Sequence, residues 1–281
     1  MGVSIEKARE FVYANGILWE RAAFAYLFGD QNRRQAHLAR LHQCLLCYKN
    51  TDDGWGHALE HDIKTPDSHP LALEYILQVT VRDWDIPAGN LFDGTVAWVS
   101  NNQTDDGALK NPPSVLTYPH APWWNEGGQT APDSITGNLT ALGLVSPELA
   151  SKTQAWAQEN LTLEKIQANE WLFMAYHAFD YFMNVDDFPD VETYRVATIE
   201  NIRECAAKAP EKQYPALLAF APTPDSRVSK AMPELVERSL TYLLDTQEAD
   251  GRWRDEHDLG HWQPAATIGA LRALQRHGKL D

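Results

Sequence analysis

The densest group of titratable side chains in the sequence follows an Asp-Gly pair at residues 53–54. Within six residues it contains His57, Glu60, His61 and Asp62. If this segment is helical, the two histidines share a face at the i, i+4 spacing typical of metal ligands. If it is extended, the two carboxylates share a face instead and form a pair that suits acid–base chemistry. The remaining interpretation is a solvated polar loop.

A second polar cluster follows another Asp-Gly pair at residues 250–251. It contains Asp255, His257, Asp258 and His261. Both clusters lie between the turn and the next expected helix, and equivalent connectors of a closed ring lie at one end of it. We therefore expect the two clusters to converge on one rim, where a divalent metal is possible. The candidate catalytic residues are Glu60, Asp62, His57, His61, Asp258 and His261.

Aromatic residues supply the candidate substrate contacts. The chain has 10 Trp, 10 Tyr and 9 Phe, which suffice for a ring-rich core or for a cavity walled by aromatic faces. Two prolines hold residues 118–124 out of regular helix, so this segment either caps a cavity or plugs a joint between helices. The predicted substrate-binding residues are Trp55, Tyr118, His120, Trp123, Trp124, Trp171, Tyr176 and Trp262.

Polar residues also interrupt segments that are otherwise apolar. Residues 171–183 are apolar almost all round, which predicts a buried helix, yet they include His177 and Asp180. A buried acid there would have a raised pKa, whereas an acid that is hydrogen-bonded or at the helix edge would be structural. We interpret Asp133, which precedes Ser-Ile-Thr-Gly, as a helix N-cap.

The elements that must position these residues are helices. Prolines at 70, 233 and 264 stand where helices are expected to begin. After Pro233, apolar residues follow the i, i+4, i+7, i+8 spacing of a helix with one buried face. Strand patterns are scarce, and the nearest, residues 79–81, ends a convincing helix. The sequence predicts an all-α protein.

Three segments repeat one turn pattern: Asn50–Trp55, Gln103–Gly107 and Gln247–Trp253. Each has a carboxamide residue four positions before a glycine and an aspartate directly before it. The glycine is expected to take a positive φ and the carboxamide to cap main-chain groups at the helix ends. The spacing predicts five or six helical hairpins of about fifty residues, which would make residues 1–281 a single domain.

Residues 238–253 closely resemble the QW motif of the terpenoid cyclase and protein prenyltransferase superfamily. They keep the basic start at Arg238, the aromatic-aliphatic pair that begins at Tyr242, the glutamine at Gln247 and the Gly-x-Trp that ends at Trp253. Looser copies are residues 48–55 and 103–107. The resemblance implies an α/α toroid, in which two concentric rings of helices surround a central cavity.

The resemblance also implies candidate activities. Class II terpene cyclases of this superfamily use an aspartate of a D-x-D-D motif as the initiating acid; the chain lacks that motif, and the nearest substitute is the pair Glu60 and Asp62. The prenyltransferase zinc site uses Asp, Cys and His, but no cysteine accompanies the cluster at 255–261. We expect an isomerase or lyase that acts on an apolar, isoprenoid-type substrate by acid-initiated chemistry. The alternatives are a carbohydrate-active hydrolase or lyase and a non-catalytic protein that binds a ligand or partner.

Charge and composition exclude several classes of partner. The net charge of −15 argues against nucleic acid and against anionic membranes, and no apolar run approaches the roughly 20 residues of a membrane span. The start of the sequence lacks the apolar region of a secretory signal, and three cysteines favour reduced thiols in the cytoplasm. Cys44 and Cys47 are interpreted as buried core residues. The expected ligand is a small apolar molecule or a glycan, and the oligomeric state stays open.

Overall fold

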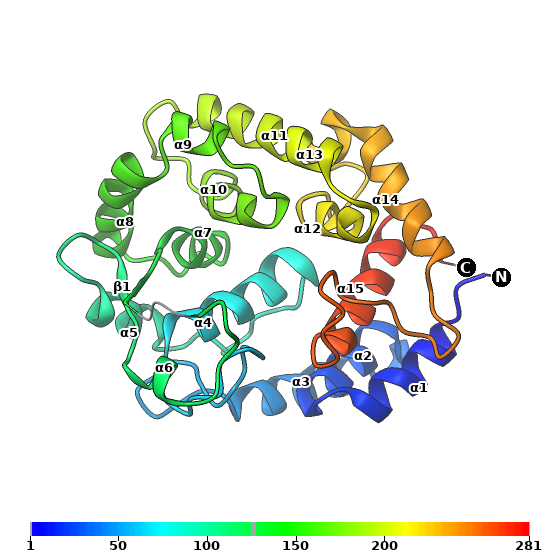
Figure 1. The fold of residues 1–281 in the computed structure, drawn as a ribbon. Helices are drawn as coiled ribbons and strands as arrows, with labels where there is room; N and C mark the ends of the chain where they lie inside the picture. The colour runs from blue at the N-terminus through cyan, green and yellow to red at the C-terminus, as the bar shows by residue number, and fades with distance from the viewer. Residues whose placement is uncertain (1, 125–127, 281) are drawn as a thin grey trace. The chain divides into compact units, whose positions relative to one another are not determined.

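The structure is a computed structural model that describes residues 2–124 and 128–280 (Figure 1). It is predominantly helical, as predicted. The chain divides into two compact units, Met1–Leu46 with Ala206–Asp281, and Cys47–Cys205. We describe each unit by itself. Over the described ranges, no helix combines the length and the apolar character that crossing a bilayer requires.

The first unit is built from both ends of the chain. Its N-terminal elements are α1 (Ile5–Asn15), α2 (Leu18–Phe28), the 3-10 turn η1 (Gln31–Arg33) and α3 (Arg34–Leu46). Its C-terminal elements are η4 (Glu211–Ala216), α12 (Leu217–Phe220), α13 (Arg227–Ala231), α14 (Pro233–Asp245) and α15 (Gln263–Arg276). As predicted, α14 begins at Pro233. Helix α15 begins at Gln263, one residue before the predicted start at Pro264.

The second unit contains the middle of the chain. Its elements up to the short antiparallel pair are α4 (Pro70–Leu77), the π-helical turn η2 (Gln78–Asp83), α5 (Thr95–Asn102), β1 (Leu109–Lys110), α6 (Ser114–Thr117) and β2 (Gln129–Thr130). The rest are α7 (Asp133–Ala141), α8 (Pro147–Asn160), α9 (Leu163–Gln167), η3 (Leu172–Ala175), α10 (Tyr176–Phe182) and α11 (Val191–Lys208). The last helix runs past the end of the unit at Cys205.

Helices α4, α7 and α10 pack together in the second unit. Helix α7 packs against both α4 and α10 (Figure 1). The helix that begins at Pro70 continues beyond Leu77 as a π-helical turn, so residues 79–81 extend a helix. A π-helical turn widens the backbone spiral and is frequent at functional sites. Here it carries Arg82, which reaches α10 through an ion pair with Asp180.

The repeated Asp-Gly turns have the predicted backbone in two of three copies. Gly107 and Gly251 have φ of +88° and +94°, the left-handed region that glycine enters without strain. In the first copy it is Asp53 that has positive φ, at 67°. Gly54 is needed there for space, because a Cβ atom on it would lie 2.5 Å from the indole of Trp98.

The carboxamides of two copies close their turns in the same way. The side-chain amide of Gln103 donates to the carbonyl of Gly107 at 3.1 Å, and Gln247 donates to Gly251 at 2.9 Å. In the first copy the main-chain N–H of Asn50 closes the turn, and its side-chain amide reaches the carbonyl of Pro66 instead. The shorter Asn side chain therefore ties the turn to the following loop.

The prediction of one buried helix over residues 171–183 is wrong. Trp171 lies before the helix, a 3-10 turn follows, and α10 begins only at Tyr176. Asn169 holds this break, because its side chain accepts from the N–H of Trp171 and donates to the carbonyl of the same residue. As a result Trp171 and Phe173 are 43% and 46% exposed.

Candidate functional site

The first polar cluster of the sequence folds as a compact turn. The segment at 57–62 is neither helical nor extended, since His57 and Ala58 have φ of 56° and 61°, so the two histidines do not share a helix face. His57 is exposed, and its Nε2 lies 2.7 Å from the side-chain oxygen of Asn50. His61 is buried and meets the ring of Tyr75 edge-on.

Glu60 is the chemically perturbed member of this first cluster. Its carboxylate accepts a hydrogen bond from the N–H of Asp62 at 2.9 Å. Burial and the nearby charge of Asp62 raise the pKa of Glu60 to about 8, against smaller opposing effects that include Lys64. A carboxyl group with this pKa is mostly protonated at neutral pH.

The second polar cluster belongs to the first unit and shapes the loop before α15. Asp255 accepts hydrogen bonds from the N–H groups of His257 and Leu259. Asp258 is exposed, has a φ of 56° and accepts from the side chain of Gln263 at 3.0 Å. These carboxylates therefore stabilise a turn. The two clusters lie in different units, so their convergence stays a prediction.

The predicted substrate-binding aromatics fall into buried and exposed groups. Trp55 is fully buried, lies 5.7 Å from the ring of Phe92 and is part of the core. Trp124 is half-buried against an apolar cluster that includes Ile63. The exposed or partly exposed members are Tyr118, His120, Trp123, Trp171 and Trp262, the last of which neighbours the exposed His261.

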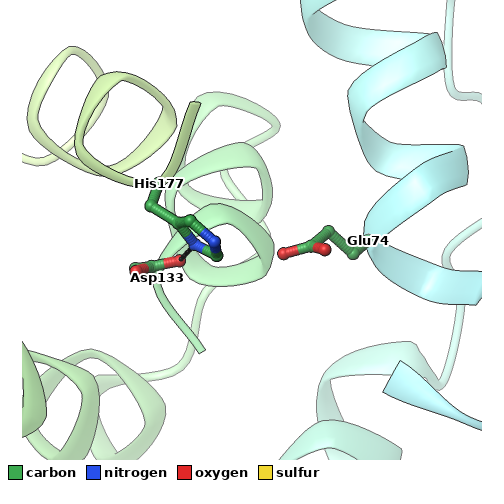
Figure 2. A group of neighbouring side chains, drawn as sticks. All are labelled: Glu74, Asp133 and His177. Carbon is green, nitrogen blue, oxygen red and sulfur yellow. Dashed lines mark hydrogen bonds and ion pairs between the residues drawn. The ribbon is translucent and has the colours of Figure 1, made fainter. Parts of the chain in front are cut away.

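A different group of side chains, which the sequence interpretation did not bring together, lies in the core of the second unit. Glu74 comes from α4, Asp133 from the first turn of α7 and His177 from α10. One potential ligand atom from each lies within 4.8 Å of the other two. Figure 2 shows the imidazole between the two carboxyl groups, with Glu74 pointing towards it from the opposite side to Asp133. We call these three residues the buried cluster.

Hydrogen bonds hold each member of the buried cluster. Nδ1 of His177 lies 2.9 Å from Oδ1 of Asp133, which also accepts from the N–H of Ser134. The hydroxyl of Tyr176 donates to Oε2 of Glu74 at 3.1 Å, and its ring stacks on the imidazole with centroids 4.1 Å apart. Asp133 is the first residue of α7, where Pro132 is the N-cap, so its interpretation as a cap is wrong. Its carboxylate orients the histidine.

An ion pair adjoins the buried cluster. Asp180 is 1% exposed and pairs with Arg82 at 3.0 Å. It also accepts hydrogen bonds from the side chains of Ser134 at 2.7 Å and Asn138 at 3.1 Å. Burial raises the pKa of Asp180, although Arg82 opposes this. The sequence left open whether Asp180 is a buried acid with a raised pKa or an acid held by hydrogen bonds. In the structure it is both.

Burial and mutual charge shift the pKa values of the buried cluster. Burial raises the pKa of Glu74 to about 7, although the charge of His177 works against it. Burial by itself lowers the pKa of His177, but the charge of Asp133 and the hydrogen bond to it, with help from Glu74, raise that pKa to about 9. The imidazole therefore carries a proton that two carboxyl groups stabilise.

A pocket of about 220 Å³ reaches the buried cluster. Asp133 and His177 form part of its wall, and apolar side chains of α8 and its neighbours form another part, among them Trp156, Leu161 and Ile166. The pocket thus combines apolar side chains with the charged residues Asp133, His177 and Lys165, and such mixed linings are common in ligand-binding sites.

The amide and hydroxyl groups in the same wall are already hydrogen-bonded within the protein. Asn160 and Thr198 each donate to a main-chain carbonyl four residues earlier. Asn169 and Asn201 bond to each other, since the amide of Asn169 donates to the side-chain oxygen of Asn201 at 2.9 Å. These groups therefore offer a ligand less hydrogen bonding than their residue types indicate.

Single acids within apolar helical segments were the sequence signal for this site. Glu74 lies in Pro-Leu-Ala-Leu-Glu-Tyr-Ile-Leu, and His177 and Asp180 interrupt an aromatic segment. Charged side chains are rarely buried unless they are paired, so such residues point to a polar site inside the fold. What the sequence did not contain was the packing of α4, α7 and α10 that brings them together.

Comparison with known proteins assigns no family. No protein-family model matches the chain, and no curated protein is significantly similar to it in sequence.

Proposed function

We propose that this protein is an enzyme that performs acid–base chemistry on an apolar substrate, with the buried cluster as its reaction centre. We further propose that it belongs to the α/α-toroid class that the QW-like turns predict. The shared closure of two turns by Gln103 and Gln247 supports the repeat on which that class rests. The toroid arrangement is part of the proposal.

One observation carries the proposed chemistry: an imidazole lies between two buried carboxyl groups at the wall of a pocket. In this proposal His177 exchanges a proton with the substrate, because it and Asp133 line the pocket. Asp133 keeps the ring in one orientation through its hydrogen bond to Nδ1. Glu74 stabilises the charged ring from the other side. General acids and bases act through such positioned groups.

The pocket wall supports an apolar substrate more than a glycan. Sugar recognition needs many hydrogen-bonding groups that face the ligand, whereas here Asn160, Asn169 and Thr198 already bond within the protein. We propose an isoprenoid-type substrate that carries a hydroxyl group. His177 would protonate that oxygen, the C–O bond would break with its electron pair leaving on water, and the proton lost from the adjacent carbon would return to the cluster.

The experiment is an activity screen with matched variants. The purified protein is incubated with prenyl alcohols and, separately, with oligosaccharides, and the products are identified by mass spectrometry. We expect turnover of a prenyl alcohol that falls at least about 100-fold in Glu74→Gln and His177→Gln, the scale of one acid–base group. Glu20→Gln, which changes a buried carboxyl group of the first unit, is the control and should keep its activity.

Two outcomes would overturn the proposal. Cleavage of an oligosaccharide without any turnover of prenyl alcohols would assign the protein to carbohydrate chemistry. Full activity in Glu74→Gln together with its loss in Glu60→Gln or Asp62→Asn would move the reaction centre to the first polar cluster. Circular dichroism on every variant separates loss of activity from loss of folding.

A further inference from the structure

We infer that the buried cluster is a binding site for one divalent transition-metal ion, held by Glu74, Asp133 and His177. This inference concerns the same three residues as the proposed function. A metal-bound imidazole nitrogen carries no proton to donate, so the metal-bound and proton-donating forms of the buried cluster are alternatives, and each has its own test. One nitrogen of the imidazole and one oxygen of each carboxyl group already lie within 4.8 Å of one another. Ligands of a tetrahedral zinc ion lie about 3.3 Å apart, so shifts of about 1 Å would complete the set.

Two buried oxygens of this cluster point to a missing ligand. In the described part of the chain, Oε1 of Glu74 and Oδ2 of Asp133 are buried and have no hydrogen-bond partner. The two residues are 6% and 0% exposed, and Figure 2 shows the carboxyl group of Glu74 aimed at the imidazole. A buried carboxylate oxygen without a partner is costly, because it has lost its water and gained nothing in return. A cation bound there would restore the lost interactions.

The charges around the cluster favour a cation as the ligand. The nearby Arg82 pairs with Asp180 at 3.0 Å and with Asp83 at 2.8 Å. Its positive charge is therefore already matched by two other carboxylates. Glu74 and Asp133 are left to share one imidazole. A divalent ion bound between them would balance both carboxylates directly.

The ligand types indicate the class of metal. One imidazole with two carboxylates suits zinc, manganese or ferrous iron, whereas magnesium and calcium prefer sites made of oxygen ligands alone. Hydrogen bonds from neighbouring groups already orient the ligands, since Tyr176 donates to Glu74 and the N–H of Ser134 donates to Asp133. Such outer contacts are a regular feature of metal sites, where they hold the ligands in place.

The test is equilibrium metal binding by the full chain without substrate. Protein treated with a chelator is titrated with Zn²⁺ by calorimetry, and with Co²⁺ while visible absorption is recorded. We expect one ion per chain and the d–d bands of cobalt bound by nitrogen and oxygen. Affinity should fall at least about 10-fold in Glu74→Gln and in His177→Gln. Glu20→Gln removes a buried carboxyl group of the first unit and should bind as the wild type does.

The inference is wrong if the wild type binds no stoichiometric ion, or if both variants bind as tightly as it does. Tyr176→Phe gives a second test that leaves every ligand in place: removing its hydrogen bond to Glu74 should weaken binding by less than removing a ligand. Binding without turnover would leave the metal site standing and refute the enzyme proposal. Turnover that survives removal of all metal would support the proposed function, while the titration alone decides whether the buried cluster binds an ion.

Discussion

Replacing Glu60 by glutamine should change how the stability of the second unit depends on pH. The carboxyl group of Glu60 is buried, and burial with the charge of Asp62 raises its pKa from 4.5 to about 8. In the unfolded chain the same group titrates near 4.5. Between these two values the folded protein keeps a proton that the unfolded chain releases. The free energy of unfolding must therefore fall as pH rises through this window, and it levels off above about pH 8.

The size of this change in unfolding free energy follows from the difference between the folded and unfolded pKa values of Glu60. Each unit of pKa difference corresponds to about 1.4 kcal/mol, so the contribution lost between pH 5 and pH 8 is about 4 kcal/mol. Glutamine has no proton to lose, and its side-chain oxygen can still accept from the N–H of Asp62 as Glu60 does. The unfolding free energy of Glu60→Gln should therefore lack this slope. The advantage of the variant over the wild type should grow as pH rises.

The assay is urea unfolding at pH 5, 6, 7 and 8, with the helical signal and tryptophan fluorescence followed together. Glu148→Gln is the control, because Glu148 is exposed in the same unit. This variant should keep the pH dependence of the wild type. Identical slopes for wild type and Glu60→Gln would refute the reasoning, and so would a variant that loses stability relative to the wild type as pH rises.

Three further predictions concern the framework of the protein. Asp180→Asn should lower the free energy of unfolding by ~3–5 kcal/mol, because it removes the buried carboxylate that pairs with Arg82 and leaves only the pair with Asp83; a loss below ~1 kcal/mol in urea unfolding would contradict this. Gly54→Ala should destabilise by ~1–3 kcal/mol, since its Cβ would lie 2.5 Å from an indole ring. Gly128→Ala is the control, because a Cβ atom at Gly128 would meet no atom within 4 Å. Equal melting temperatures for the two alanine variants would contradict the packing argument. Gln247→Ala should lower the free energy of unfolding by ~1–2 kcal/mol, because it removes the hydrogen bond that closes the turn; an unchanged melting curve would contradict it.

The sequence pattern was sufficient for features that depend on neighbouring residues. Proline at the first turn marked where helices begin, and the apolar spacing after Pro233 marked the buried face of α14. The Asp-Gly turns were predictable because only glycine enters the left-handed region freely, as Gly107 and Gly251 do. In the first copy Gly54 does not have a positive φ but is needed for space, because Trp98 lies against it, and no local pattern contains that contact.

The candidate site depended on contacts between segments that are distant in the chain. Crowding along the sequence drew attention to residues 57–62, where carboxylates and histidines lie within one short turn. Glu74, Asp133 and His177 are separated by 59 and 44 residues, so no spacing rule connects them. The positions of Glu74 and His177 among apolar residues were readable, but their partners were not.

The sequence alone determined that this chain is helical, where its turns fall, and that a few acids and a histidine stand among apolar residues. Those properties follow from backbone preferences and periodicity, which act over a few residues. The tertiary structure decided which of those polar residues meet. Packing of α7 against α4 and α10 places an imidazole between two buried carboxyl groups and beside a pocket. Burial removes water from these groups and shifts their pKa values. Burial of that kind arises only when distant segments pack together.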